Sequence, residues 1–349
     1  MYNSVKNQGI NLKVLVALSG GVDSSMSAKY LVEAGYEVVG CYMKLHAKPG
    51  YHEENIRKVK KVGEFLGIQT HVLDLEKEFK TSVYDLFINA YKEGLTPNPC
   101  AVCNKNIKFG ALWEFAKSLK CDKMATGHYA MIEDGLIKSA FDKSKDQSYF
   151  LANVSPEILP FVIFPLGDKL KVDIKADAAK IPQIAELASQ KESSEICFVE
   201  TTYIDELKKH FDTNKPGVVR LKDGKAVGKH DGYMHYTIGK RKGFTVDGAH
   251  DPHYVLAIDP AKNEIIVGLK DELESYDFET VNFNNFTSND EFECFVKIRY
   301  RSPKIPCFVS KSGNGAKVSL KQNAGGVASG QLAVFYDEFD RVMASGFIR

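Results

Sequence analysis

The chain has 349 residues, which exceeds the about 100–200 residues of one ordinary domain and predicts two or three hydrophobic cores. Lys and Arg total 46 against 45 Asp and Glu, a formal net charge of +1, and 44% of the residues are hydrophobic. This composition excludes a wholly disordered chain, and it lacks the general basic excess of a protein that coats nucleic acid. Any nucleic-acid surface must therefore be local.

We expect a cytoplasmic protein without membrane contact. The apolar run 14–18 leads into glycines rather than into a signal-peptide cleavage site, and the apolar stretch 159–166 is far shorter than the about 20 residues that span a bilayer. The seven cysteines are an odd number in a long chain. They fit a reducing compartment, in which an important cysteine serves chemistry or binds metal rather than forming a structural disulfide.

Short β-branched runs alternate with amphipathic stretches from residue 13 to about residue 130, as in a parallel α/β sheet. The pattern predicts strands at 13–18, 37–44, 70–73 and 123–126, and helices at 23–34, 52–66, 77–92 and 105–119. A hairpin is expected around Glu133-Asp134-Gly135, followed by helices at 169–179 and 182–190. This is the layout of a doubly wound nucleotide-binding domain.

Strand-like runs replace helices after about residue 215. They are separated by turn residues, which predicts small barrels or sandwiches, and they cover 217–221, 253–258, 263–267, 305–310, 316–320 and 331–336. Residues 271–293 contain eight acidic side chains and no Lys or Arg, so we place a domain boundary near 270–280. The predicted parts are an α/β domain at 1–205, a small β-rich domain at 206–272 and a C-terminal β-barrel at 273–349.

The first predicted strand ends in the loop Ser19-Gly20-Gly21-Val22-Asp23-Ser24, which precedes a helix. Glycines let successive backbone N–H groups turn toward an anion, and the helix N-terminus adds about half a positive charge. The loop matches neither the Walker A motif nor the dinucleotide GxGxxG motif. A glycine turn capped by Asp23 or Ser24 is the structural alternative, but we interpret this loop as a phosphate-binding site.

An SGGxDS loop after the first strand resembles the PP-loop of ATP pyrophosphatases, which cleave ATP to AMP and pyrophosphate while they adenylate a substrate oxygen. The resemblance implies an adenine nucleotide alpha hydrolase-like fold that uses ATP with Mg2+. Met43 follows the second predicted strand, at the sheet edge where such ligands bind, and core packing is its simpler explanation. The candidate nucleotide-binding residues are Ala17, Leu18, Ser19, Gly20, Gly21, Val22, Asp23, Ser24, Met43 and Gly127.

Two cysteine features stand out. Cys100 and Cys103 form a CxxC spacing in a proline-containing loop, just ahead of the helix that we expect to begin near Lys105. A helix N-terminus and nearby lysines lower the pKa of a thiol, so Cys103 is a candidate nucleophile. Cys197 lies in a mixed polar and apolar turn and would, taken alone, be a core residue. The others are expected to be inert small hydrophobic residues: Cys41, Cys121, Cys294 and Cys307.

Several motifs together resemble those of the bacterial tRNA-specific 2-thiouridylases, in order and spacing over nearly the whole chain. They are the PP-loop, TPNPCAVCN at 96–104, TGHYA at 126–130, DQSYF at 146–150, the Cys197 segment, YTIGKR at 236–241, RYR at 299–301 and GQLAVFY at 330–336. The resemblance implies a transferase that uses ATP to convert the wobble uridine (U34) of tRNA to 2-thiouridine. A cysteine desulfurase or a sulfur-relay protein would supply the sulfur.

The resemblance also implies residue roles. Cys197 would carry a persulfide, and Cys103 would act as nucleophile and form a Cys103–Cys197 disulfide when the product leaves. Family members commonly have Asp, a residue of acid/base chemistry, where this chain has Cys100; either this thiol transfers protons or Asn98 and the backbone position the base. The positions implied to contact tRNA are Asn98, Pro99, Cys100, His128, Lys145, Asp146, Gln147, Arg299, Tyr300 and Gln331.

Alternatives to this mechanism stay open. Cys100, Cys103 and Cys197 could hold a 4Fe-4S cluster with one open iron, although clusters usually have four cysteine ligands. Structural zinc is less favoured because it needs four ligands, and we assign no metal site. Rival functions are another PP-loop enzyme, such as an amide or argininosuccinate-type ligase, and a non-catalytic RNA-binding or sulfur-carrier protein.

Two local basic patches are candidates for RNA binding. Residues 217–243 contain seven Lys or Arg against two Asp, and residues 297–304 contain four basic residues and no acid. Strand alternation over 291–301 would place Lys297, Arg299 and Arg301 on one face. Strict alternation would place Arg299 and Tyr300 on opposite faces, so both can contact tRNA only if the strand ends there. Ser302-Pro303 supplies such an ending. An ordinary solvated strand face is the alternative explanation.

Overall fold

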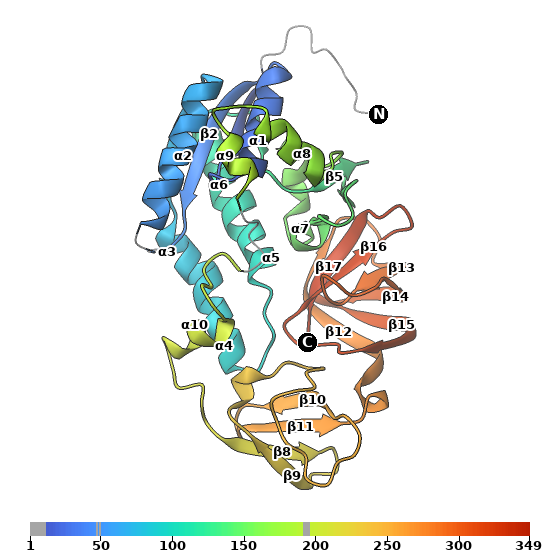
Figure 1. Cartoon of the computed structure of the whole chain (residues 1–349). Coiled ribbons are helices and arrows are strands. Elements are labelled where there is room, and N and C mark those ends of the chain that lie inside the picture. Colours follow the sequence, from blue (N-terminus) through green and yellow to red (C-terminus); the bar gives the residue numbers. More distant parts are fainter. Residues whose placement is uncertain (1–11, 47, 49, 191–195) are drawn as a thin grey trace. The chain divides into compact units, whose positions relative to one another are not determined.

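The computed structural model describes residues 12–46, 48, 50–190 and 196–349 (Figure 1). These residues form two compact units. The first comprises the described parts of Met1–Lys80 and Asn104–Glu192, and the second comprises the described parts of Thr81–Cys103 and Ser193–Arg349. The segment Thr81–Cys103 therefore belongs to the second unit, although it interrupts the first unit in sequence.

The first unit contains a five-stranded parallel sheet with the strand order β3-β2-β1-β4-β7. Its four longer strands confirm the predicted ones: β1 (Lys13–Ala17), β2 (Glu37–Lys44), β3 (Gln69–Asp74) and β4 (Lys123–Ala125). We did not predict β7 (Val162–Ile163), because two residues are too few for a periodic signal.

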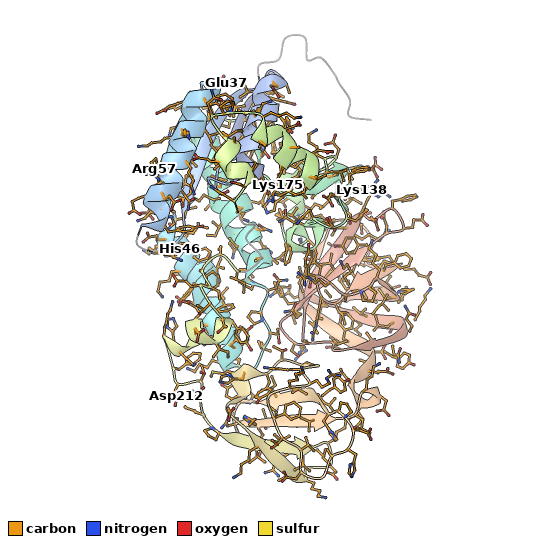
Figure 2. All side chains as sticks on the ribbon, in the orientation of Figure 1. Glu37, His46, Arg57, Lys138, Lys175 and Asp212 are labelled. Atoms are coloured by element: carbon orange, nitrogen blue, oxygen red, sulfur yellow. The ribbon has the colours of Figure 1, made fainter. Side chains whose placement is uncertain are left out.

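The helices predicted in the first unit are largely confirmed. They are α1 (Val22–Glu33), α2 (Tyr51–Leu66), α8 (Lys171–Ala179) and α9 (Ala185–Ala188), the last shorter than predicted. Apolar side chains of α1 and α2 form one core with those of β1 and β2. In Figure 2, Arg57 marks α2 and Lys175 marks α8. No helix in the described part of the chain has the length and hydropathy needed to cross a membrane.

The hairpin predicted near residue 134 is also present, as β5 (Ala130–Glu133) and β6 (Leu136–Ser139). Asp134 and Gly135 have φ values of 51° and 77°, the left-handed pair of a tight hairpin turn. The first unit also contains α7 (Ser148–Leu151) and the 3-10 helix η3 (Pro156–Phe161).

The two long helices predicted around the CxxC motif are built from shorter segments. The first consists of α3 (Glu76–Phe79), the π-helix η1 (Lys80–Tyr84) and α4 (Asp85–Lys92). The second consists of α5 (Pro99–Cys103), the π-helix η2 (Asn104–Ala111) and α6 (Leu112–Ser118).

The prediction that the CxxC motif lies in a loop ahead of Lys105 is wrong, because helical structure begins at Pro99. The side-chain oxygen of Asn98 accepts the backbone N–H of Ala101 at 3.2 Å, so Asn98 caps the helix. Proline suits the first helical position because the N–H that it lacks would have no partner inside the helix. The proline that suggested a loop therefore starts the helix.

The second unit contains a four-stranded sheet with the order β10-β11-β8-β9. Three strands lie where runs were predicted: β8 (Gly217–Leu221), β10 (Tyr254–Asp259) and β11 (Glu264–Gly268). The fourth, β9 (Ala226–His230), was missed because its residues lack β-branched repetition. Short helices flank the sheet: α10 (Tyr203–Lys208), η4 (Tyr233–His235) and η5 (Asp271–Leu273).

The C-terminal residues form the predicted β-barrel. It is closed in the order β12-β15-β14-β13-β16-β17. Its strands are β12 (Glu274–Asn285), β13 (Glu291–Lys297), β14 (Ile305–Ser312), β15 (Gly315–Gly325), β16 (Leu332–Tyr336) and β17 (Val342–Ile348). We did not predict β12, because its sequence is acidic. Its charged residues Asp277 and Glu279 are exposed, while Thr280 is buried.

Phe335 provides a test of the barrel core. It is fully buried and lies opposite Val296 on β13 and Ala344 on β17. We expect Phe335→Ala to lower the free energy of unfolding by about 3–5 kcal/mol because it leaves a cavity. Urea denaturation measures the loss. The matched control is Phe308→Ala on β14, where the ring is 39% exposed; equal losses in both variants would contradict the barrel core.

Candidate functional site

The loop between β1 and α1 has the backbone geometry expected of an anion site. Gly20 has φ +83°, and Gly21 precedes the helix in an extended conformation. The hydroxyl of Ser24 accepts the N–H of Ser19 at 3.1 Å and donates to the carbonyl of Gly21 at 3.0 Å. Gly21 is the N-cap of α1, with no side-chain cap bond. Ser24 closes the turn itself, as in the structural alternative, so this geometry is common to both interpretations.

Gly127 lies directly against the glycine loop between β1 and α1. It follows β4, which neighbours β1 in the sheet. A Cβ atom at residue 127 would lie 2.9 Å from the backbone nitrogen of Ser24 and 3.0 Å from the carbonyl carbon of Asp23. Both contacts involve backbone, so only glycine fits here without displacing the loop.

The carboxylate of Asp23 is held by two partners that the sequence did not indicate. The ammonium of Lys171 donates to both carboxylate oxygens at 2.6 Å, and the hydroxyl of Tyr129 donates to Oδ1 at 2.8 Å. Lys171 stands 148 positions from Asp23 and belongs to no motif that we recognised. Only the packing of α8 against α1 reveals this group.

His128 is buried, with Thr126 and Lys108 as neighbours. Its Nδ1 lies 2.7 Å from Thr126 Oγ1, and its Nε2 lies 3.4 Å from Lys108 Nζ. A protonated lysine can only donate, so Nε2 accepts and the ring proton sits on Nδ1. Burial, with a contribution from Lys108, holds the pKa of His128 well below 6.5. The ring is therefore neutral at physiological pH.

The neighbouring motif residues have internal contacts. Gln147 accepts the N–H of Tyr129 through Oε1 at 3.0 Å, and Asp146 accepts the N–H of Ala140 through Oδ1 at 2.9 Å. Both side chains thus hold the backbone around the β5–β6 hairpin. Lys145 is half-buried, and Met43 is half-buried near the carboxyl end of β2. Of the two remaining loop candidates, Leu18 is buried and Ala17 ends β1.

The candidate cysteines belong to the second unit. Cys100 is half-buried, Cys103 is buried and Cys197 is exposed. Because α5 begins at Pro99, Cys100 is its second residue and Cys103 its last. The helix N-terminus therefore lies nearer to Cys100, and the argument for a lowered pKa at Cys103 from its place ahead of a helix no longer holds.

The segment before this helix is attached to the barrel beside Gln331. The N–H of Thr96 donates to the carbonyl of Ser329 at 2.8 Å, and Gln331 Nε2 donates to the carbonyl of Thr96 at 3.1 Å. Gly330, with φ +89°, allows this segment of the barrel to lie close to Leu95 and Thr96. The structure thus brings Gln331 next to the segment that contains Asn98, Pro99 and Cys100.

The Cys197 segment is attached to the same part of the chain through its neighbour Phe198. This buried ring lies 5.3 Å from the ring of Tyr84 and 5.1 Å from that of Phe87, both measured between centroids. Edge-on aromatic contacts of this kind stabilise packing beyond the area they bury. They anchor the turn that carries Cys197 to the segment that leads to the CxxC helix.

The predicted basic stripe on the barrel is wrong in part, because β13 ends at Lys297 and alternation does not reach Arg299 and Arg301. The guanidinium of Arg299 instead donates to the carbonyls of Ile238 and Gly326, both at 2.8 Å. Arg299 therefore joins the 236–241 motif to the barrel. Tyr300 lies in the turn that follows β13, with Lys297 Nζ 5.6 Å from its ring centroid.

Among the residues that the structure describes, no group of three or more His, Cys, Asp or Glu side chains is arranged to hold a metal ion. The described residues include Cys100, Cys103 and Cys197. The four remaining cysteines are buried, as expected: Cys41, Cys121, Cys294 and Cys307. Burial raises the pKa of Cys41 to about 12, which leaves this thiol unreactive.

The fold and the loop define a class: a PP-loop nucleotide-binding domain followed by two β-rich domains. Family models agree with this. The tRNA methyl transferase HUP domain matches residues 12–201, the tRNA methyl transferase PRC-barrel domain matches 204–269, and the aminomethyltransferase beta-barrel domain matches 275–348.

Full-length relatives identify the family. The chain is 82% identical over 338 residues to the tRNA-specific 2-thiouridylase MnmA of Campylobacter fetus, covering 97% of this chain and 100% of that protein. With the same coverage of both chains, it is 62% identical to the protein of that name from Campylobacter concisus and 58% identical to that from Campylobacter jejuni. The chain belongs to the tRNA-specific 2-thiouridylase family.

The neutral, buried His128 predicts a pH dependence of stability. Its pKa is lower in the folded than in the unfolded chain, so the unfolded state binds the proton first as pH falls. We expect the free energy of unfolding to decrease below about pH 6.5, by at most about 1.4 kcal/mol per pH unit from this group. Urea denaturation between about pH 5 and 7.5 measures this slope.

The matched variant is His128→Asn, which should lose this part of the slope. Burial also lowers the pKa values of His46, His230 and His235, so these groups add to the slope of both proteins. The difference between wild type and variant is therefore the quantity to compare. Identical slopes would contradict a buried, neutral His128.

Proposed function

We propose that this protein is an ATP-dependent sulfurtransferase that converts the wobble uridine (U34) of tRNA to 2-thiouridine. The observation that carries the proposal is its similarity, over 97% of the chain and 100% of each relative, to proteins named tRNA-specific 2-thiouridylase. The glycine-built loop after β1 supports the proposal because it is an anion cradle in the place where a PP-loop domain binds ATP.

In the first step, the C2 oxygen of the uracil attacks the α-phosphate of ATP and pyrophosphate leaves. Residues 17–24 would hold the phosphates, Met43 would cover the adenine and Gly127 would allow close approach. The C2 oxygen alone is a poor leaving group. Once adenylated, it can leave as AMP, so carbon C2 becomes open to attack. Mg2+ would enter with ATP, since Asp23, the one carboxylate of the loop, already contacts Lys171 through both oxygens and does not fit as a metal ligand.

In the second step, the terminal sulfur of a Cys197 persulfide attacks C2 and AMP leaves. Cys103 as a thiolate then attacks the Cys197 sulfur, the S–S bond to the substrate breaks, and its electron pair stays on the sulfur of 2-thiouridine. A Cys103–Cys197 disulfide forms, and a cellular dithiol reductant supplies two electrons to reopen it. The exposure of Cys197 supports loading by a cysteine desulfurase or a sulfur-relay protein.

We propose that Cys100 takes the place of the usual acid/base carboxylate. Its half-buried position in the short helix that also carries Cys103 supports this role. The side-chain oxygen of Asn98, the alternative helper, already accepts the backbone N–H of Ala101 and so caps the helix. It would therefore position Cys100 rather than transfer a proton.

The proposed tRNA contacts come from both units. A uridine must be turned out of the anticodon loop to reach ATP, which suits recognition of single-stranded loops. Several of the candidate residues make internal hydrogen bonds, so we propose that they act mainly by shaping the binding surface: Asn98, His128, Asp146, Gln147, Arg299 and Gln331. The proposed direct contacts are Pro99, Cys100, Lys145 and Tyr300.

A 4Fe-4S cluster on Cys100, Cys103 and Cys197 is the alternative to the persulfide route. The two routes differ in a simple observable. Protein purified without oxygen that is colourless and iron-free, yet still thiolates tRNA, uses the persulfide route. A brown protein whose activity follows its iron content uses the cluster.

Cys197→Ser tests the sulfur chemistry. With ATP, Mg2+, a cysteine desulfurase with cysteine, and unmodified tRNA, the wild type should form thiolated tRNA that is retarded on a mercury-containing gel. The variant should form none, because it lacks the sulfur that carries the persulfide. Cys121→Ser, at a buried cysteine of the first unit, is the matched control and should thiolate normally. Full thiolation by Cys197→Ser would show that the persulfide assignment is wrong.

Gly127→Ala tests the nucleotide site. The added methyl group collides with the backbone of Ser24 and Asp23, so the loop must move. We expect ATP binding, measured by calorimetry, to weaken at least about tenfold while the protein stays folded. Gly325→Ala is the control, because a Cβ there meets only a leucine side chain at 3.8 Å. Unchanged ATP affinity in Gly127→Ala would place the nucleotide elsewhere.

A further inference from the structure

Lys171 is a buried cation beside the phosphate loop. The residue is 7% exposed, and its Nζ lies 2.6 Å from each carboxylate oxygen of Asp23. Lysine is almost never this buried unless it is paired, because its charge loses most of its hydration. The geometry therefore pairs this ammonium with one specific carboxylate.

Three further contacts fix the position of this pair. Lys171 begins α8, and its backbone N–H donates to Asp142 Oδ2 at 3.0 Å. Its ammonium lies 5.7 Å from the ring centroid of Tyr129, and the hydroxyl of Tyr129 donates to Asp23 at 2.8 Å. The ammonium, the phenol and the carboxylate thus form one rigid group at the start of α1.

The charge of Asp23 would otherwise oppose the function of the loop. A carboxylate inside a cradle for a triphosphate repels it, and this repulsion is strong where the surroundings are poorly hydrated. Lys171 cancels that charge. The ammonium of Lys171 and the hydroxyl of Tyr129 bind the carboxylate. The carboxylate therefore does not compete with the anion for the N-terminus of α1.

We propose that Lys171 is a positioning residue for ATP binding, which acts by neutralising and orienting Asp23 rather than by contacting the phosphates. This inference rests on the proposed ATP-dependent function. It makes a specific claim: Lys171 is needed only because Asp23 is charged. Removing both charges together should therefore restore what removing the lysine destroys.

A charge cycle tests this claim with ATP affinity as the readout. Lys171→Met leaves an unneutralised carboxylate in the loop and should weaken ATP binding at least about tenfold. The double variant Asp23→Asn with Lys171→Met has nearly the same shape but neither charge. Although Asp23 lies in the proposed phosphate-binding loop, we expect this variant to bind ATP at least about threefold more tightly than Lys171→Met. Calorimetry with ATP and Mg2+ measures both, and thermal unfolding confirms that each variant is folded.

Lys180→Met is the matched control. It removes the exposed lysine at the C-cap of α8, which pairs with Asp177, and it should leave ATP affinity unchanged. Removing the lysine leaves an unpaired carboxylate and lowers the stability of the fold. If Lys171→Met does not fold, ATP binding by the double variant supports the proposal, and no binding overturns it.

Each outcome has one meaning. Normal ATP affinity in Lys171→Met overturns the proposal. A double variant that folds but does not regain ATP binding also overturns it, because Lys171 would then bind the phosphates directly; one that fails to fold shows a purely structural pair. Failure of the wild type to bind ATP or to thiolate tRNA would instead refute the proposed function.

Discussion

The pairing of one carboxylate with one buried ammonium joins distant parts of the first unit. Asp23 lies in the glycine loop after β1, and its charge is balanced by Lys171 from a helix that begins about 150 residues later. Tyr129 completes the group, and the backbone N–H of Tyr129 is in turn held by Gln147. Residues from three distant segments thus keep one loop in shape.

A different constraint organises the second unit. The segment Thr81–Cys103 is hydrogen-bonded to each neighbouring part in turn: Tyr84 donates to Glu206 at 2.6 Å, the Lys92 carbonyl accepts from Tyr233 at 2.7 Å, and Thr96 donates to Ser329 at 2.8 Å. The CxxC helix follows directly. Its position therefore depends on both β-rich domains, which explains why the cysteine motif packs with them.

The sequence predicted what local periodicity and chain order determine. The strands β1 to β4, the hairpin at Asp134 and the glycine loop follow from patterns within about ten residues. The start of the CxxC helix was missed because proline suggested a loop, although Asn98 ahead of Pro99 is a recognisable cap. The pairing of Lys171 with Asp23 could not be predicted, since no local pattern selects one lysine among many.

The same limit applies to residue roles. Motif resemblance identified Gln147 and Arg299, but the structure shows each of them hydrogen-bonded to backbone within its own unit. A motif residue can stabilise the backbone of a surface that binds RNA without contacting the RNA itself. The glycine loop belongs to the first unit, and the three candidate cysteines, Cys100, Cys103 and Cys197, belong to the second. Uridine activation and sulfur transfer would therefore depend on different sets of long-range contacts, each of which must be read from the structure.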